Sequence, residues 1–431
     1  MNQIYHSTAP MDLPSSSRLA SRLAVVAQPD YTSLDVFWAS HPRWPLPPGS
    51  RETSSNSGHG TTTKAEKEAG EEEEIHIGIF DSSFNPPTLA HLEIASTSFP
   101  STHPESSSTT TDSSPTSSRN EAVDSKQIVE DHENDKSRLR RSGYTAKLLL
   151  LSARNVDKPP THLGDEDAEG QKEQERKVRE NATAVERVEM MVLQARRMVA
   201  ALSSSSSSDQ QNRNDEQEEE SNSNIAVAVL NFPTFVGKSR IIHSWLDQTL
   251  PGLLQDLKPE STSPARNPKV RLSFLIGSDT LTRLFRPAYY PPSSSFPEIG
   301  PDMETQLKYF FEQDRSRIVC VRRYLKSGER EEEERFVRED DGCKQWVKSG
   351  GIRFVEESET AGGTGAGAGV KSGEEMGLIS STLIRQRVDQ VRQETQGPDD
   401  NPEELTVKAL EGLCIDDVSR YIARKGLYLR S

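Results

Sequence analysis

The sequence predicts an α/β protein with a Rossmann-like, doubly wound parallel sheet, in a single domain that disordered insertions interrupt. Short apolar runs rich in β-branched residues alternate along the chain with segments of helical spacing. The runs are nearly continuous, as in parallel strands that helices bury on both faces. Only 32% of the 431 residues are hydrophobic. That share is low for two or three domains, so we expect one folded core of roughly 250 residues.

Six apolar runs are the expected strands, at residues 75–80, 147–152, 225–230, 270–276, 317–321 and 352–355. Between and after them, apolar residues recur three and four positions apart, as on one face of a helix. These helical segments are expected at residues 185–198, 241–250, 383–391 and 418–427. In a doubly wound sheet, ligands bind beyond the carboxyl ends of the strands. Functional motifs are therefore expected directly after strands.

Polar, low-complexity sequence separates these elements and cannot bury enough apolar surface to order a core. Residues 1–74 are expected to form an N-terminal segment that is largely disordered toward its end, and residues 75–431 the main domain. Insertions in the main domain are expected near residues 100–138, 157–182, 203–224, 326–341 and 360–374.

Composition also argues against several classes of function. The net charge of −15 disfavours a general nucleic-acid-binding surface, which needs basic patches. The three cysteines are widely spaced and form neither a disulfide framework nor a metal-ligand pattern. No apolar run reaches the ~18 residues of a membrane span, and no secretory signal is evident. We therefore expect an intracellular protein of the cytosol or nucleus that binds neither membrane nor nucleic acid.

The most informative motif follows the first expected strand and reads DSSFNPPTLAH, residues 81–91. Its small residues and prolines favour a tight turn, with Thr88 as the N-cap of a helix. Backbone N–H groups in such a turn, together with a helix N-terminus, can bind an anion. His91 follows Thr88 by three residues, on the same face. It could therefore donate a hydrogen bond to a bound phosphate.

Two further motifs could contact a nucleotide. The run ISSTLIR, residues 379–385, places hydroxyls at a helix start, where Ser381 and Thr382 can bind phosphate oxygens. Arg385 lies one turn after Ser381, and its guanidinium could hold phosphates in a bidentate way. Gly277 and Asp279 directly follow the strand 270–276, so the glycine allows close approach and the carboxylate could bind a ribose hydroxyl.

Together the three motifs resemble those of the nicotinamide mononucleotide adenylyltransferases, within the Thr/His-x-Gly-His nucleotidyltransferase superfamily and nearest to its fungal branch. The resemblance runs discontinuously from about residue 75 to residue 428. It also covers RVEM at residues 187–190, Arg323 after the fifth expected strand, and the C-terminal Tyr421 and Tyr428. Lys158 is similar to the lysine that contacts ATP phosphates in this family.

The resemblance implies transfer of AMP from ATP to nicotinamide mononucleotide, which forms NAD⁺ and pyrophosphate. The implied catalytic residues are His91, Lys158 and Arg385. The implied nucleotide-binding residues are Ser82, Ser83, Phe84, Thr88, Gly277, Asp279, Ser381, Thr382 and Arg385. Mg²⁺ would be carried by the ATP phosphates and water, without a protein metal site.

The chain also departs from the family. Ser82 stands in place of a frequent glycine, and Ala90 precedes His91 where glycine is common. The expected Trp-Glu pair after the third strand is replaced by NFPTF, residues 231–235, in which Phe232 or Phe235 could stack on the nicotinamide ring. Two alternatives therefore stay open. One is adenylyl or cytidylyl transfer to a different acceptor, such as pantetheine phosphate. The other is an ATP-binding or ATP-hydrolysing regulator, for example in protein quality control.

Overall fold

The computed structural model describes residues 12–47, 74–97, 143–153, 181–204, 224–257, 268–290, 296–322, 327–356, 378–395 and 401–428. The insertions expected near residues 100–138, 157–182, 203–224 and 360–374 lie wholly or largely outside these ranges. So does the end of the N-terminal segment, from residue 48 to residue 73. None of the helices formed by the described residues is long and apolar enough to span a membrane.

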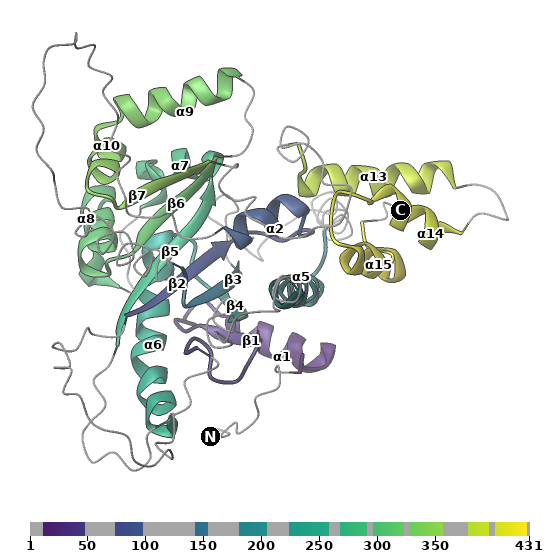
Figure 1. Ribbon diagram of the computed structural model, residues 1–431, viewed down its shortest axis with the longest axis horizontal. Helices are drawn as coiled ribbons and strands as arrows, with labels where there is room; N and C mark the ends of the chain where they lie inside the picture. The colour runs from purple at the N-terminus through teal and green to yellow at the C-terminus, as the bar shows by residue number, and fades with distance from the viewer. Residues whose placement is uncertain are drawn as a thin grey trace, which may run out of the picture.

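One seven-stranded sheet organises the chain (Figure 1), with the strand order β1-β4-β3-β2-β5-β6-β7. Its strands are β1 (Asp35–Ala39), β2 (Glu74–Asp81), β3 (Ala146–Ser152), β4 (Ile225–Leu230), β5 (Lys269–Gly277), β6 (Arg317–Arg322) and β7 (Ile352–Glu356). β2 to β7 are all parallel. All six expected strands are confirmed, and so is the doubly wound order. The order reverses between β2 and β5, where such sheets bind ligands.

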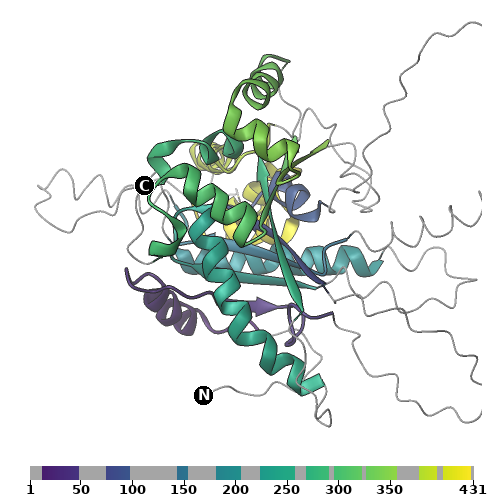
Figure 2. The ribbon, with the colours of Figure 1, turned by 90° about the vertical axis from the view of Figure 1, so that its left-hand side faces the viewer.

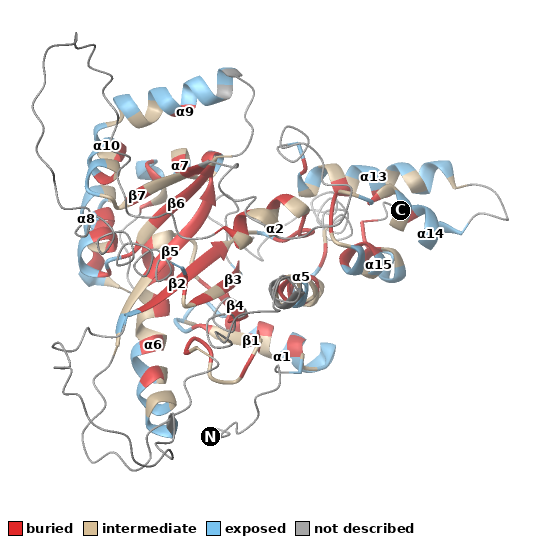
Figure 3. Ribbon diagram, in the orientation of Figure 1, coloured by how far each residue is buried: buried red, intermediate tan, exposed pale blue. Residues whose placement is uncertain are grey.

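Helices cover both faces of the sheet. Apolar side chains of α1 (Ser16–Val26), α2 (Leu89–Ser96) and α5 (Ala184–Ser204) pack on one face. The other face packs against α6 (Phe235–Leu257), α7 (Ser278–Leu284), α8 (Met303–Lys308) and α10 (Asp341–Lys348). Figure 2 views the molecule from this second side, with α6 running diagonally across the sheet. The strands are buried along most of their length, whereas the outer sides of the helices are exposed (Figure 3).

Three C-terminal helices form a smaller apolar cluster beside the sheet. They are α13 (Ser381–Glu394), α14 (Pro402–Ala409) and α15 (Asp416–Lys425). Their buried side chains meet Ala90 of α2 and Met190 of α5. Figure 1 shows this helical unit beyond α2 and α5, at the right of the view. The C-terminal part of the chain is therefore packed directly against the helix that carries His91.

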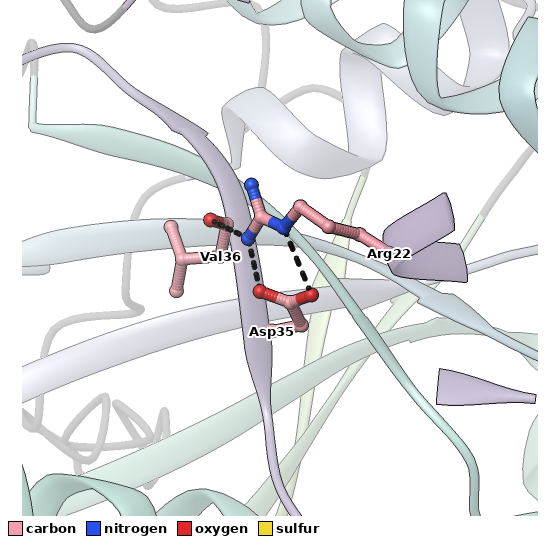
Figure 4. Close-up of polar contacts among 3 residues, drawn as sticks. All are labelled: Arg22, Asp35 and Val36. Atoms are coloured by element: carbon pink, nitrogen blue, oxygen red, sulfur yellow. Dashed lines mark hydrogen bonds and ion pairs between the residues drawn. The ribbon is translucent and has the colours of Figure 1, made fainter. Parts of the chain in front are cut away.

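The N-terminal segment contributes α1 and β1, which the apolar pattern did not predict. β1 pairs with β4 and is the single antiparallel strand of the described sheet. The guanidinium of Arg22 on α1 forms an ion pair with Asp35 and donates to the carbonyl of Val36 at 2.9 Å (Figure 4). It also lies 4.2 Å from the ring centroid of Phe37. These contacts fasten the helix to the strand that covers the β4 edge.

The segment 326–341, expected to be a flexible insertion, instead contains helix α9 (Ser327–Glu339). Although most residues of this helix are charged, one of its faces packs against the rest of the protein. Glu333 is buried and accepts a hydrogen bond from Nε of Arg322 at 2.7 Å, while Phe336 contacts Phe285 with ring centroids 5.9 Å apart. Phe336 and Val337 pack against the core of the sheet, so this segment forms a helix that its charged composition did not suggest.

Candidate active site

The three predicted motifs occupy the carboxyl side of the sheet, where its strand order reverses. Residues 82–88 leave the end of β2, and Gly277 ends β5. These two strands are direct neighbours, with Phe80 paired to Leu275. The turn after β2 and the start of α7 after β5 therefore begin side by side.

Thr88 and His91 form a reciprocal cap at the start of α2. Oγ1 of Thr88 accepts the backbone N–H of His91 at 3.1 Å, and the backbone N–H of Thr88 donates to Nδ1 of His91 at 3.0 Å. This confirms Thr88 as the N-cap. Because Nδ1 acts as an acceptor, the proton of the neutral imidazole is on Nε2.

The Nε2 atom of His91 points back toward the turn. It lies 3.1 Å from Oγ of Ser82, which can accept its hydrogen. The imidazole is also held between two aromatic rings, with centroid distances of 5.7 Å to both Phe80 and Phe84. The structure therefore fixes both the orientation and the tautomer of His91, with its donor directed at the turn after β2.

The turn has an unusual backbone conformation at Phe84. Phe84 is fully buried, yet its φ is +45°, an uncommon value for a residue with a side chain. The backbone N–H groups of Ser83 and Phe84 donate no hydrogen bond to another described residue. Ser83 is exposed. Adjacent N–H groups in such a turn can converge on an anion.

Asn85 is the centre of the turn, although the sequence analysis gave it no role. Its Oδ1 accepts the backbone N–H of Ala182 and the hydroxyl of Tyr428, both at 3.1 Å. Its Nδ2 donates to Oδ1 of Asn181 at 2.6 Å. A buried side chain so fully bonded holds the turn against α5 and the C-terminal helices. An asparagine between an aromatic residue and two prolines was the only signal in the sequence.

The second motif meets the first across 300 residues of sequence. Nη1 of Arg385 donates to the carbonyl of Asn85 at 2.9 Å, and Nη2 donates to Oγ1 of Thr382 at 3.1 Å. Oγ of Ser381 donates to the carbonyl of Pro86 at 2.7 Å. Ser381, Thr382 and Arg385 are thus gathered on the turn that carries Ser82 to Thr88.

A buried ion pair lies at the end of β2, next to the turn. The ammonium group of Lys238 on α6 contacts the carboxylate of Asp81 at the end of β2, with side chains 5% and 10% exposed. The other carboxylate oxygen accepts the hydroxyl of Ser152, at the end of β3, at 3.1 Å. Asp81 therefore joins the ends of two strands to the start of a helix. The sequence gave no sign of the pairing, because the partners are 157 positions apart.

The other predicted residues lie at the start of α7, near the start of α6, or outside the described residues. Gly277 is the N-cap of α7, and Asp279 is in the first turn of that helix. The rings of Phe232 and Phe235 pack on Phe296 and Phe274 respectively, with centroids 5.5 Å apart in each pair. Lys158 and Arg323 lie outside the described residues.

Comparisons with known proteins add little. A scan against protein-family models found no match, and a search of curated proteins found none either. Among solved structures, the chain is similar to Plasmodium falciparum nicotinic acid mononucleotide adenylyltransferase complexed with NaAD. The identity is 10%, the TM-score is 0.30, and the alignment covers 82% of this chain and 97% of the other. The complex of that enzyme with APC matches at 9% identity and a TM-score of 0.31, with the same coverage. Such distant likeness carries no argument about activity, which must be inferred from the site.

Proposed function

We propose that the chain is an adenylyltransferase that transfers AMP from ATP to nicotinamide mononucleotide and releases pyrophosphate. The phosphate oxygen of the mononucleotide attacks the α-phosphorus of ATP in line. A new P–O bond forms as the bond to the β-phosphate oxygen breaks. No covalent enzyme intermediate is required, because the attacking phosphate is already ionised. Catalysis then depends on positioning and on stabilising charge.

One observation carries the proposal: the fixed Nε2 donor of His91 and the guanidinium of Arg385 are bound to the same turn. The turn itself offers the N–H groups of Ser83 and Phe84. A histidine donor, a guanidinium and backbone N–H groups on one turn suit a chain of phosphates, whose charge is spread over several oxygens.

Each residue then has a distinct role. His91 donates from Nε2 to an α-phosphate oxygen as negative charge develops there. Arg385 and Lys158 neutralise the β- and γ-phosphates and the departing pyrophosphate, with Ser381 and Thr382 as hydroxyl donors. Thr88 holds His91 in place, and Ser82 accepts from Nε2 before the substrate does. Gly277 and Asp279, beyond the neighbouring strand, hold the adenosine, and Mg²⁺ enters with ATP.

The test is a direct assay of both products. The purified full chain is incubated with ATP, Mg²⁺ and nicotinamide mononucleotide, and NAD⁺ and pyrophosphate are measured together. We expect equal amounts of the two. Parallel reactions contain nicotinate mononucleotide, pantetheine phosphate or no acceptor. Pyrophosphate that appears only with another acceptor would refute the choice of acceptor. ADP and inorganic phosphate as sole products would refute adenylyl transfer.

A further inference from the structure

A second arginine, Arg187, lies close enough to Arg385 for the two charges to interact. Arg187, in the first turn of α5, donates from Nε to the carbonyl of Ala182 at 2.9 Å. The N–H of Ala182 in turn donates to Oδ1 of Asn85 at 3.1 Å, whose own carbonyl accepts from Arg385. The two guanidinium groups are therefore anchored to two residues that are hydrogen-bonded to each other.

Among the described residues neither guanidinium is in an ion pair with a carboxylate, although the charge of Glu186 acts on Arg187. None of the ion pairs formed there includes Arg187 or Arg385. The acidic side chains nearest in sequence are turned elsewhere. Glu186 accepts the backbone N–H of Thr183 at 2.7 Å, and Glu189 accepts hydroxyls from Ser16 and Tyr421.

The electrostatic surroundings of Arg187 agree with this geometry. Burial lowers the pKa of its guanidinium, and the positive charge of Arg385 lowers it further, while Tyr428 and Glu186 act in the opposite direction. An arginine stays protonated under such conditions. Two like charges in a half-buried place repel each other, and a bound anion would relieve that repulsion.

Both side chains have hydrogen-bond donors to spare. A guanidinium carries five N–H donors. Arg187 uses one of them on the described residues, through Nε, and Arg385 uses two. We propose that Arg187 is a further phosphate-binding residue, and that Arg187 and Arg385 form a two-guanidinium clamp for the polyphosphate of ATP and for pyrophosphate. The identity of the nucleotide in this inference rests on the proposed function. The test below therefore includes inorganic pyrophosphate, a ligand whose choice does not depend on that function.

The test measures binding of inorganic pyrophosphate, and of ATP, to the full chain by calorimetry. In Arg187→Ala we expect both to bind about 10- to 100-fold more weakly, as for the loss of a charge-assisted hydrogen bond. The matched control is Arg196→Ala, which removes the same charge from an exposed position of α5 and should bind pyrophosphate within about twofold of the unaltered chain. Wild-type affinity in folded Arg187→Ala would overturn the inference.

A second variant tests the proposal if Arg187→Ala does not fold. Arg187→Lys keeps the charge but loses the planar fork, so pyrophosphate should bind several-fold more weakly, and unchanged binding overturns the inference. The product assay separates this inference from the proposed function. Pyrophosphate binding that depends on Arg187, in a chain that makes no NAD⁺, refutes only the proposed function. NAD⁺ formation with an unchanged KM for ATP and unchanged pyrophosphate binding in Arg187→Ala refutes only the clamp.

Discussion

Thr88 and His91 each supply a hydrogen-bond acceptor to the other's backbone N–H, at 3.1 and 3.0 Å. One pair of residues thus begins helix α2 and also fixes the proton of the imidazole on Nε2. The structural and chemical uses of His91 can therefore be separated by substitution, because they depend on different ring nitrogens.

Replacing His91 with asparagine should abolish catalysis while preserving the fold. Oδ1 of asparagine can take the place of Nδ1 as acceptor for Thr88, but the distal donor is lost. We expect kcat to fall by about 10²–10³, with the unfolding free energy in urea nearly unchanged. His91→Ala is the comparison, since it loses the same donor and also the acceptor for the backbone N–H of Thr88, so it should be less stable than His91→Asn by about 1 kcal/mol. Full activity in His91→Asn would rule out the proposed donor.

Lys238→Met should strongly destabilise the protein, because it leaves the carboxylate of Asp81 buried without a countercharge. Breaking a buried ion pair from one side costs about 3–5 kcal/mol, whereas removing both charges is often nearly neutral. We therefore expect the double variant Asp81→Asn with Lys238→Met to be more stable than Lys238→Met alone. Urea unfolding of Lys238→Met, Asp81→Asn, the double variant and the unaltered chain measures this coupling. Additive losses would show that the pair contributes nothing to stability.

Stability should decline in mild acid because of His76. Burial, reinforced by the positive charges of Arg271, Arg317 and Arg353, lowers the pKa of His76 to about 3, whereas an unfolded histidine titrates near 6.5. Between these pH values the unfolded chain binds the extra proton. The unfolding free energy is thus fully retained above about pH 6.5 and falls by up to about 1.4 kcal/mol per unit below it.

The measurement is urea unfolding at pH 7.5, 6.5 and 5.5, with His76→Gln as the control. Glutamine can still bond to Ser273, the hydroxyl partner of His76 at 2.8 Å, but it does not titrate. Its stability should therefore fall less steeply with acid. Some slope should remain, since burial also lowers the pKa values of His41 and His243. Identical slopes in both proteins would contradict the assignment to His76.

Deleting residues 1–47 should leave a chain that aggregates. The deletion removes the buried side chains of Phe37 and Trp38 and uncovers the β4 edge, and an unpaired edge strand invites association with other chains. Deleting only residues 1–11 is the matched control, because α1, β1 and the contacts of Arg22 remain. Size-exclusion chromatography and thermal unfolding compare the two. A monomeric, cooperatively folded 48–431 chain would show that β1 is dispensable.

The central fold was predictable because its strands are buried on both sides. Runs such as residues 225–230 consist only of apolar residues, so they indicate buried strands even when the neighbouring strands and helices are not known. β1 was missed for the opposite reason. It is five residues long, lies at an edge, and depends on α1 and Arg22 for its place. Helix α9 was missed because its packed face contains only a few contacts within a run of charges.

The site was predictable as a set of motifs but not as an arrangement. Local spacing was enough to identify Thr88 as a cap and to place His91 on its helix. It could not reveal that Asn85 joins the turn to Tyr428, or that Lys238 pairs with Asp81, because these partners are distant in sequence. The role of Arg385 as a phosphate ligand stays a prediction, whereas its bond to the backbone of Asn85 could not be inferred from the sequence.

The bond between Asn85 and Tyr428 also affects when the site can be completed during synthesis. Its partners are 343 positions apart. At about 5–20 residues per second, the ribosome needs roughly 17–70 s to make the intervening chain. Throughout that interval the turn after β2 exists without its phenolic partner and without the guanidinium of Arg385. A nascent chain should therefore complete the geometry of the candidate site only late in translation, well after the first strands are available to pair.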